Sequence, residues 1–268
     1  MLAEAKAGTA YLQFSRAGEH TVLTRAFSTS PAKLISTNPG RAACWVYAAT
    51  LGGGFVGGDR VDLSADVEDG ARALLTTQAS TKVYRSLRRS RQSVTAKIGD
   101  AALLAVIPDP IVCYARADFA QTQRYELAAG ASLVLVDWMT SGRRNCGEHW
   151  AFSRYESRVT ITRGDRTVFM DAVVLQPGFD AVAARMSGCH VLLTLVITGP
   201  LVRDAADELL RRISALPIGP LVAASPLTRG GIVVRMAGTS VEHVGRALRE
   251  RLAFLDPLIG GDLWSRKW

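Results

Sequence analysis

The chain has 268 residues, of which 48% are hydrophobic and 21% are charged, and its formal net charge is +8. These are ordinary values for a globular protein and they exclude global disorder. The longest apolar run, Val191 to Ile197, is far shorter than the roughly 20 residues of a membrane span. The amino-terminal segment carries charges where a secretory signal needs an apolar core, so we expect a soluble protein of the cytoplasm.

A glycine-rich loop from Leu51 to Arg60, LGGGFVGGDR, contains the letters G-x-G-x-x-G of a dinucleotide fingerprint. That fingerprint requires a strand before the loop and a helix after it. The preceding CWVYAATL fits a strand, but the following RVDLSADVE alternates apolar and polar residues with the period of a second strand. No G-K-[ST] follows, which excludes a Walker A loop. We predict that the loop joins two strands and that its glycines permit positive φ angles or close backbone approach.

Turn signals and short apolar segments continue along the chain. Asp69-Gly70 predicts a hairpin that leads into the strand ARALLTTQ, and Gly164-Asp165 predicts a second hairpin. Similar strands follow Gly70, Gly99 and Gly130 at intervals of about 30 residues, which indicates either a structural repeat or a chance alignment of common residues. Further candidate strands are HTVLTRAF, QSVTAKI, AALLAVI, IVCYA, DFAQTQRYEL, ASLVLVDWM, RVTITR and TVFMDAVVL.

Two amphipathic helices are predicted in the C-terminal third. The first begins at Pro200 and has an apolar stripe that ends at Leu216. The second begins with a capping box, Thr239 to Glu242, and its stripe reaches Leu255. The proline- and glycine-rich PIGPLVAASPLTRGG between them is predicted to be a long connector. The predicted fold is mainly β, with layered antiparallel or mixed sheets that are β-helix-like or sandwich-like, in a single domain of residues 1–268.

No catalytic motif is found, since G-x-S-x-G and H-E-x-x-H are both absent and the chain has only four histidines. The four cysteines lack C-x-x-C spacing, which is typical of reduced thiols. Cys146, His149, Cys189 and His190 either converge as metal ligands or are dispersed core and surface residues.

Four acidic residues lie near turn glycines or prolines. Each either caps a turn by accepting backbone N–H groups or offers a weak metal ligand. They are Asp59, Asp109, Asp137 and Glu148.

The polar segment from Thr76 to Ser86 is predicted to be a hydroxyl-rich strand that ends in Lys82, Tyr84 and Arg85. Its hydroxyl groups either pair across a sheet or belong to a docking surface, because Tyr and Arg are favoured at interface centres. The neighbouring arginine cluster, Arg85 to Arg91, leaves a nucleic-acid-binding β module as an alternative, although no aromatic residue interrupts SLRRSRQS. A small-molecule enzyme on a β scaffold is a second alternative.

Together, the segments GGGFVGGDRVDL, TTQASTKVYRS, IPDPIVCY and VDWMTSGRRNCGEHWAF resemble the urease accessory protein UreD family, also called UreH. The resemblance runs in order from about Leu34 to the C-terminal helix. It implies a largely β fold with two helices and a non-catalytic scaffold that binds UreF, through which the GTPase UreG is recruited to apo-urease, in an assembly of 2:2 type. It also implies that nickel passes through an internal channel, that GTP is bound by a partner, and that no cofactor is tightly bound to this chain.

The resemblance also suggests which residues act. We expect Asp59, Asp137 and Glu148 to offer transient oxygen ligands to nickel, because a site that holds the ion too firmly cannot release it. We expect Lys82, Tyr84 and Arg85 to contact a partner. Cys113 departs from the family pattern, in which bacterial relatives more often have a non-thiol residue, and it either touches the metal path or fills the core.

Overall fold

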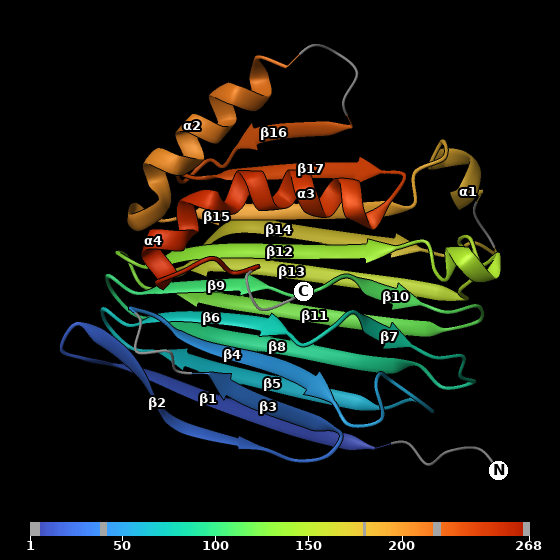
Figure 1. Ribbon diagram of the computed structural model, residues 1–268, viewed down its shortest axis with the longest axis horizontal. Helices are drawn as coiled ribbons and strands as arrows, with labels where there is room; N and C mark the ends of the chain where they lie inside the picture. Colours follow the sequence, from blue (N-terminus) through green and yellow to red (C-terminus); the bar gives the residue numbers. More distant parts are fainter. Residues whose placement is uncertain (1–5, 38–41, 179–180, 217–220, 265–268) are drawn as a thin grey trace.

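The computed structural model of the chain describes residues 6–37, 42–178, 181–216 and 221–264 (Figure 1). In these ranges the strands form two sheets with an apolar core between them. The seven-stranded sheet has the order β14-β13-β11-β8-β5-β1-β2. Its strands are β1 (Ala7–Ala17), β2 (His20–Ser28), β5 (Arg60–Val67), β8 (Ser90–Ile98), β11 (Asp118–Leu127), β13 (Arg154–Arg163) and β14 (Arg166–Leu175).

The main path of the ten-stranded sheet has the order β16-β17-β15-β12-β9-β6-β4-β3. Two short strands lie off this path: β10 pairs with β12, and β7 pairs with β10. Its strands are β3 (Ala32–Thr37), β4 (Cys44–Thr50), β6 (Arg72–Thr77), β7 (Thr81–Val83), β9 (Leu103–Ile107), β10 (Ile111–Cys113), β12 (Ser132–Thr140), β15 (Val191–Thr198), β16 (Val222–Pro226) and β17 (Ile232–Gly238). The predicted mainly β fold with mixed, layered sheets is confirmed.

The middle of the molecule is wound as a β-helix. The chain passes from β5 to β6, from β8 to β9 and from β11 to β12, each time crossing between the sheets, and successive strands of each sheet pair in parallel. Asp69-Gly70 is therefore a turn between sheets, and the predicted hairpin there is wrong, because β6 pairs with β4 and β9 and not with β5. The hairpin at Gly164-Asp165 is confirmed, since β13 and β14 pair antiparallel on either side of it.

The repeat of about 30 residues corresponds to these coils, and its turns stack on one another. The Asp69 side chain accepts the backbone N–H of Asp100 at 2.7 Å, and the Asp100 side chain accepts that of Gly130 at 2.6 Å. A Cβ at Gly99 would collide with the backbone N of Asp69 at 2.7 Å. The glycines of the repeat thus allow one turn to lie directly on the next.

The glycine-rich loop joins β4 of one sheet to β5 of the other, which confirms the predicted strand on each side. All five of its glycines have positive φ. Phe55 forms a parallel bridge with Val83, and β7 pairs in parallel with β10, so the loop begins a short third face of the β-helix made by Phe55, β7 and β10. A Cβ at Gly54 would press on the Lys82 carbonyl oxygen and lie 2.9 Å from Tyr84 Cε2.

The segment from Thr76 to Ser86 is not one strand. β6 ends at Thr77 and β7 begins at Thr81, so the residues between them turn the chain onto the third face. The connector between the two long helices was also predicted wrongly, because it contains β16, which pairs antiparallel with β17. Its residues 217–220 lie outside the described ranges.

The two long helices lie over the outer face of the ten-stranded sheet, where they cover a second apolar core (Figure 1). α2 buries Ala206, Leu209 and Ile213, whereas the predicted stripe residue Leu216 is 41% exposed. The α3 cap is Ser240, one residue later than predicted, because its Oγ accepts the His243 N–H at 3.2 Å. The helices are α1 (Val182–Arg185), α2 (Arg203–Ser214), α3 (Val241–Leu252) and α4 (Asp256–Ile259), with 3₁₀ turns at Arg144–Cys146, Pro200–Val202 and Ala253–Leu255.

Within the described ranges, no helix has the length and apolar character that crossing a bilayer would require.

Replacing Gly54 by Ala is expected to lower the free energy of unfolding by about 3 kcal/mol, because the new methyl group meets the adjacent coil and the backbone has a φ of +153°. Gly178→Ala is the matched control, since its Cβ would meet nothing within 4 Å and its φ is not left-handed. We expect that variant to be unchanged or stabilised by up to about 1 kcal/mol. Urea unfolding measures both, and equal losses would contradict the coil contact.

Candidate functional site

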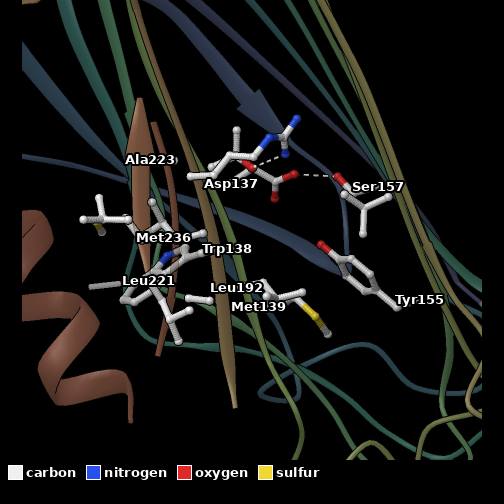
Figure 2. A pocket seen from close by; sticks show the side chains of 15 residues that line it. Asp137, Trp138, Met139, Tyr155, Ser157, Leu192, Leu221, Ala223 and Met236 are labelled. Carbon is white, nitrogen blue, oxygen red and sulfur yellow. Dashed lines mark hydrogen bonds between the residues drawn. The ribbon is translucent and has the colours of Figure 1, made fainter. Parts of the chain in front are cut away.

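A polar cluster interrupts the apolar core between the two sheets. On β12, Leu133, Leu135 and Met139 belong to this core, and the period of two places Asp137 on the same inward face. Asp137 Oδ1 accepts a hydrogen bond from Gln121 Nε2 at 2.7 Å. Asp137 Oδ2 accepts one from Ser157 Oγ at 2.6 Å (Figure 2). The carboxyl group of one sheet is thus held by donors from the other.

The donors belong to a polar row that crosses the inner face of the seven-stranded sheet. Gln121 of β11 is in register with Ser157 of β13 on one side and with Gln92 of β8 on the other. Gln121 also donates to Ser157 Oγ at 2.8 Å. Because the strands are parallel and in register, residues about 30 positions apart in the sequence form one continuous row.

The electrostatics of Asp137 disfavour its charge. Burial raises the pKa of Asp137, whereas the hydrogen bonds from Ser157 and Gln121 lower it, and the nearby Asp171 raises it again. The net direction is upward, because desolvation of a carboxylate outweighs two hydrogen-bond donors here.

Three cavities follow this polar row. The first, of about 430 Å³, lies between β13–β14 and β15–β17 and has a mostly apolar wall that includes Asp137 and Ser157 (Figure 2). The second, of about 60 Å³, shares Asp137 and Trp138 with the first and also borders Gln121. Asp137 therefore stands between the two cavities.

The third cavity, of about 180 Å³, extends to the glycine-rich loop. It shares Gln92 with the second cavity, together with Ala48, Leu63, Thr77 and Thr81. The adjoining cavities thus run from the β16–β17 edge of the sheets to the short third face, with polar side chains along one wall.

An ion pair joins the two sheets beside the first cavity. The guanidinium of Arg235 on β17 contacts both carboxylate oxygens of Asp171 on β14 at 2.9 Å, and it also donates to Thr194 Oγ1 at 3.2 Å. Arg235 itself lines the first cavity. The pair thus connects β14 of one sheet with β17 of the other on this side of the molecule.

The three predicted acidic ligands do not come together. Both oxygens of Asp59 accept backbone N–H groups, those of Lys6 at 2.9 Å and Val56 at 3.0 Å, so Asp59 caps the glycine-rich loop. Glu148 pairs with Arg143 and accepts the Ala115 N–H at 3.0 Å.

The hydrogen bond from Arg143 lowers the pKa of Glu148, against a smaller effect of burial. Asp109 exchanges hydrogen bonds with Thr77, accepting from its hydroxyl and donating to it from the backbone. The capping interpretation is thus confirmed for Asp59 and Glu148, whereas Asp137 borders the cavities.

Of the predicted partner-binding residues, Lys82 lies in β7 of the short third face, and Tyr84 and Arg85 directly follow that strand. Tyr84 meets Tyr114 edge to face with a ring separation of 5.0 Å, and Arg143 lies 4.2 Å above the Tyr114 ring. Lys82 and Arg85 are exposed beside them. The four sequence segments that carry the family resemblance therefore converge at this end of the β-helix.

The cysteines carry free thiols in the structure. Cys113 is packed in the inner core, where burial strongly raises its pKa, and burial raises the pKa of Cys44 to about 11. Cys113 does not line any of the three cavities described above. Within the described residues, no three His, Cys, Asp or Glu side chains are grouped closely enough to hold a metal ion.

Gln121 and Ser157 were missed by the sequence analysis. In DFAQTQRYEL the inward positions are Phe119, Gln121, Gln123, Tyr125 and Leu127. Two glutamines between buried aromatic residues on the same face are a detectable signal of a polar layer inside a core.

Comparisons with known proteins agree over nearly the whole chain. Residues 6–268 match the family model described as UreD urease accessory protein. The chain is 49% identical over 265 residues to a urease accessory protein UreD of Sorangium cellulosum (strain So ce56), covering 98% of this chain and 85% of the relative. It is 42% identical over 267 residues to a urease accessory protein UreD of Anaeromyxobacter sp. (strain Fw109-5), covering 97% and 90%. A urease accessory protein D of Oryza sativa subsp. indica is 34% identical over 293 residues, covering 97% and 96%.

Replacing Asp137 by Asn is expected to stabilise the fold at neutral pH. The folded pKa of Asp137 is raised above the ordinary value of 3.8, so the folded chain binds more protons than the unfolded chain between these two values. The stability of the unsubstituted protein therefore falls as the pH rises through this range. The variant does not lose this stability, because the asparagine side chain does not ionise. Thermal unfolding followed by circular dichroism should give a higher midpoint for the variant at neutral pH and converging midpoints below pH 3.8; equal midpoints at neutral pH would contradict the raised pKa.

Proposed function

The chain belongs to the UreD urease accessory protein family, and on that premise we propose that it is a non-catalytic scaffold that delivers nickel to apo-urease along the cavities between its two sheets. In this proposal it acts in the cytoplasm and bridges UreF, and through UreF the GTPase UreG, to urease. The single observation that carries the nickel route is the carboxyl group of Asp137 where two adjoining cavities meet.

The chemistry of Asp137 suits a passing cation. Carboxylate and amide oxygens are hard ligands, and few of them are available here, so an ion would be bound weakly and released readily. Burial raises the pKa of Asp137, so a proton competes with a cation for the carboxyl group and weakens its ligation. Gln121 and Ser157 fix the orientation of the carboxyl group through their hydrogen bonds.

Asp59 and Glu148 are less suited to this role. Each would have to give up backbone hydrogen bonds to bind an ion, and Glu148 would also leave Arg143. We therefore assign the transient oxygen ligand to Asp137. In this proposal, Asp59 stabilises the conformation of the glycine-rich loop, and Glu148 stabilises that of the segment after β12.

The partner surface is assigned to the short third face. Lys82 and Arg85 are exposed there, and Tyr84 is half-buried against Tyr114, which gives a rigid aromatic centre with a basic rim. Such a surface favours a partner with acidic groups. GTP would be bound by UreG and not by this chain, and a 2:2 assembly is part of the proposal.

The nickel route is tested by filling the second cavity. Ala48→Leu adds a bulky side chain to the wall that the second and third cavities share, and Asp137→Ala removes the carboxyl group. With UreF, UreG and apo-urease co-expressed, each variant is expected to lower nickel-dependent urease activation at least about tenfold while the complex still forms on size-exclusion chromatography.

Ala120→Leu is the matched control for Ala48→Leu, because Ala120 lies on the outer face of β11. Its urease activation should equal that of the unsubstituted protein. Full activation by both Ala48→Leu and Asp137→Ala would refute the route, and loss of the complex would place the defect in assembly instead.

The partner surface is tested by charge reversal. The double variant Lys82→Glu and Arg85→Glu should weaken binding of UreF at least about tenfold, because an acidic partner would then meet like charges. The matched control reverses Lys97 and Arg166, which are also exposed but lie outside the third face. Pull-down with purified UreF measures both; an equal loss in the two double variants would mean that only net charge matters.

A further inference from the structure

Two histidines from distant parts of the sequence lie together at the end of the ten-stranded sheet, away from the polar row. His149 is in the segment after β12, and His190 directly precedes β15. Their ring centroids are 4.9 Å apart, and the ring planes are inclined by 45°. His149 is exposed and His190 is partly exposed, so both imidazoles are open to solvent.

Ser141 holds both histidines in place. Its backbone N–H donates to the His190 carbonyl at 2.8 Å, and its carbonyl accepts the N–H of Trp150, the residue after His149, at 2.7 Å. Its buried hydroxyl lies 3.0 Å from His190 Nδ1. Trp150 is 4% exposed and has a φ of +54°, so a buried indole anchors the backbone beside His149.

The geometry points to a transition-metal site formed by the imidazoles of His149 and His190. Imidazole nitrogen binds borderline divalent ions such as Ni²⁺, Cu²⁺ and Zn²⁺ at about 2.0–2.1 Å. Two imidazoles on adjacent positions of one ion have ring centroids about 4.5–5.2 Å apart, since each centroid then lies about 3.2 Å from the metal. The observed 4.9 Å falls within that interval.

The hydroxyl of Ser141 fixes the orientation of the His190 ring from the side opposite the ion. A metal-binding histidine usually bonds its second ring nitrogen to a neighbouring group, which fixes the ring for ligation. Ser141 occupies that place at Nδ1 of His190 and leaves Nε2 for the ion. Within the described residues, no third His, Cys, Asp or Glu completes a cluster, so water or a partner protein would fill the other positions.

Arg144 limits the affinity of the site. Burial lowers the pKa of His190, and the positive charge of Arg144 lowers it further, so the same charge also disfavours a bound cation. Its guanidinium is held by the carbonyl oxygen of Thr239. A two-imidazole site beside an arginine is suited to exchange an ion and not to store it.

Binding of a divalent ion at this site is independent of the cavity route, whereas the identification of nickel as the ion carried in the cell rests on the proposed function. The test uses the purified full chain without urease or partner proteins, so its outcome does not depend on that function. Nickel chloride is titrated calorimetrically in imidazole-free buffer at neutral pH. The copper(II)-loaded protein is then examined by electron paramagnetic resonance for coupling to imidazole nitrogens.

We expect His149→Ala and His190→Ala each to weaken nickel binding at least about tenfold and to reduce the copper signal from two coupled nitrogens to one. Ser141→Ala should weaken binding less, and Arg144→Gln should strengthen it several-fold because a repelling charge is removed. His20→Ala, which removes an exposed histidine on β2, is the matched control and should bind within about twofold of the unsubstituted protein.

Unchanged binding in His149→Ala would overturn the site, and this variant is decisive because its side chain is exposed and its loss does not disturb the core. His190→Gln gives the same information if His190→Ala does not fold, which circular dichroism shows. A copper signal without two coupled nitrogens in the unsubstituted protein, or weaker binding in Arg144→Gln, would also overturn it.

Discussion

Parallel, in-register stacking of the coils is the constraint on which the other features depend. Each coil adds one strand to each sheet, so equivalent residues of successive coils come to lie side by side. The turns must then approach closely, which requires the absence of a side chain at Gly54 and Gly99. The same stacking assembles the polar row from single residues of β8, β11 and β13. One backbone arrangement therefore explains both the glycine-rich motif and the site.

The local pattern of the sequence was enough to predict most elements but not the sheet to which each strand belongs. Alternation identifies β5 because Val61, Leu63, Ala65 and Val67 all face the core. An Asp-Gly pair, however, bends the chain equally well into a hairpin or into the next coil. The difference lies in the strand partners, and these are set by residues that are distant in the sequence. At Gly164-Asp165 the chain closes a hairpin, since β14 pairs antiparallel with β13 and is the edge strand of the seven-stranded sheet in the described part of the chain.

The candidate site was predictable only in part for the same reason. Asp137 could be named from its sequence context, but Asp59 could be named equally well, and the two differ in what surrounds them. Backbone N–H groups occupy both oxygens of Asp59, whereas side chains from another sheet hold Asp137 beside open space. Gln121 and Ser157 are 36 residues apart, and their contact exists only because β11 and β13 are neighbours in register. Sequence spacing does not contain that information.

The two metal-binding features that we propose, the carboxyl group of Asp137 and the imidazoles of His149 and His190, differ in how strongly they bind a divalent ion. Imidazoles bind borderline divalent ions more strongly than a single carboxyl group does, and they are open to solvent in this protein. Asp137 is the weaker ligand, because burial raises the pKa of its carboxyl group and a proton therefore competes with a cation for the same oxygens. A solvent-exposed site of this kind would select the ion, and an interior site would let it pass. One chain can then select the ion at one site and release it from another, because neither site has to combine high affinity with rapid release.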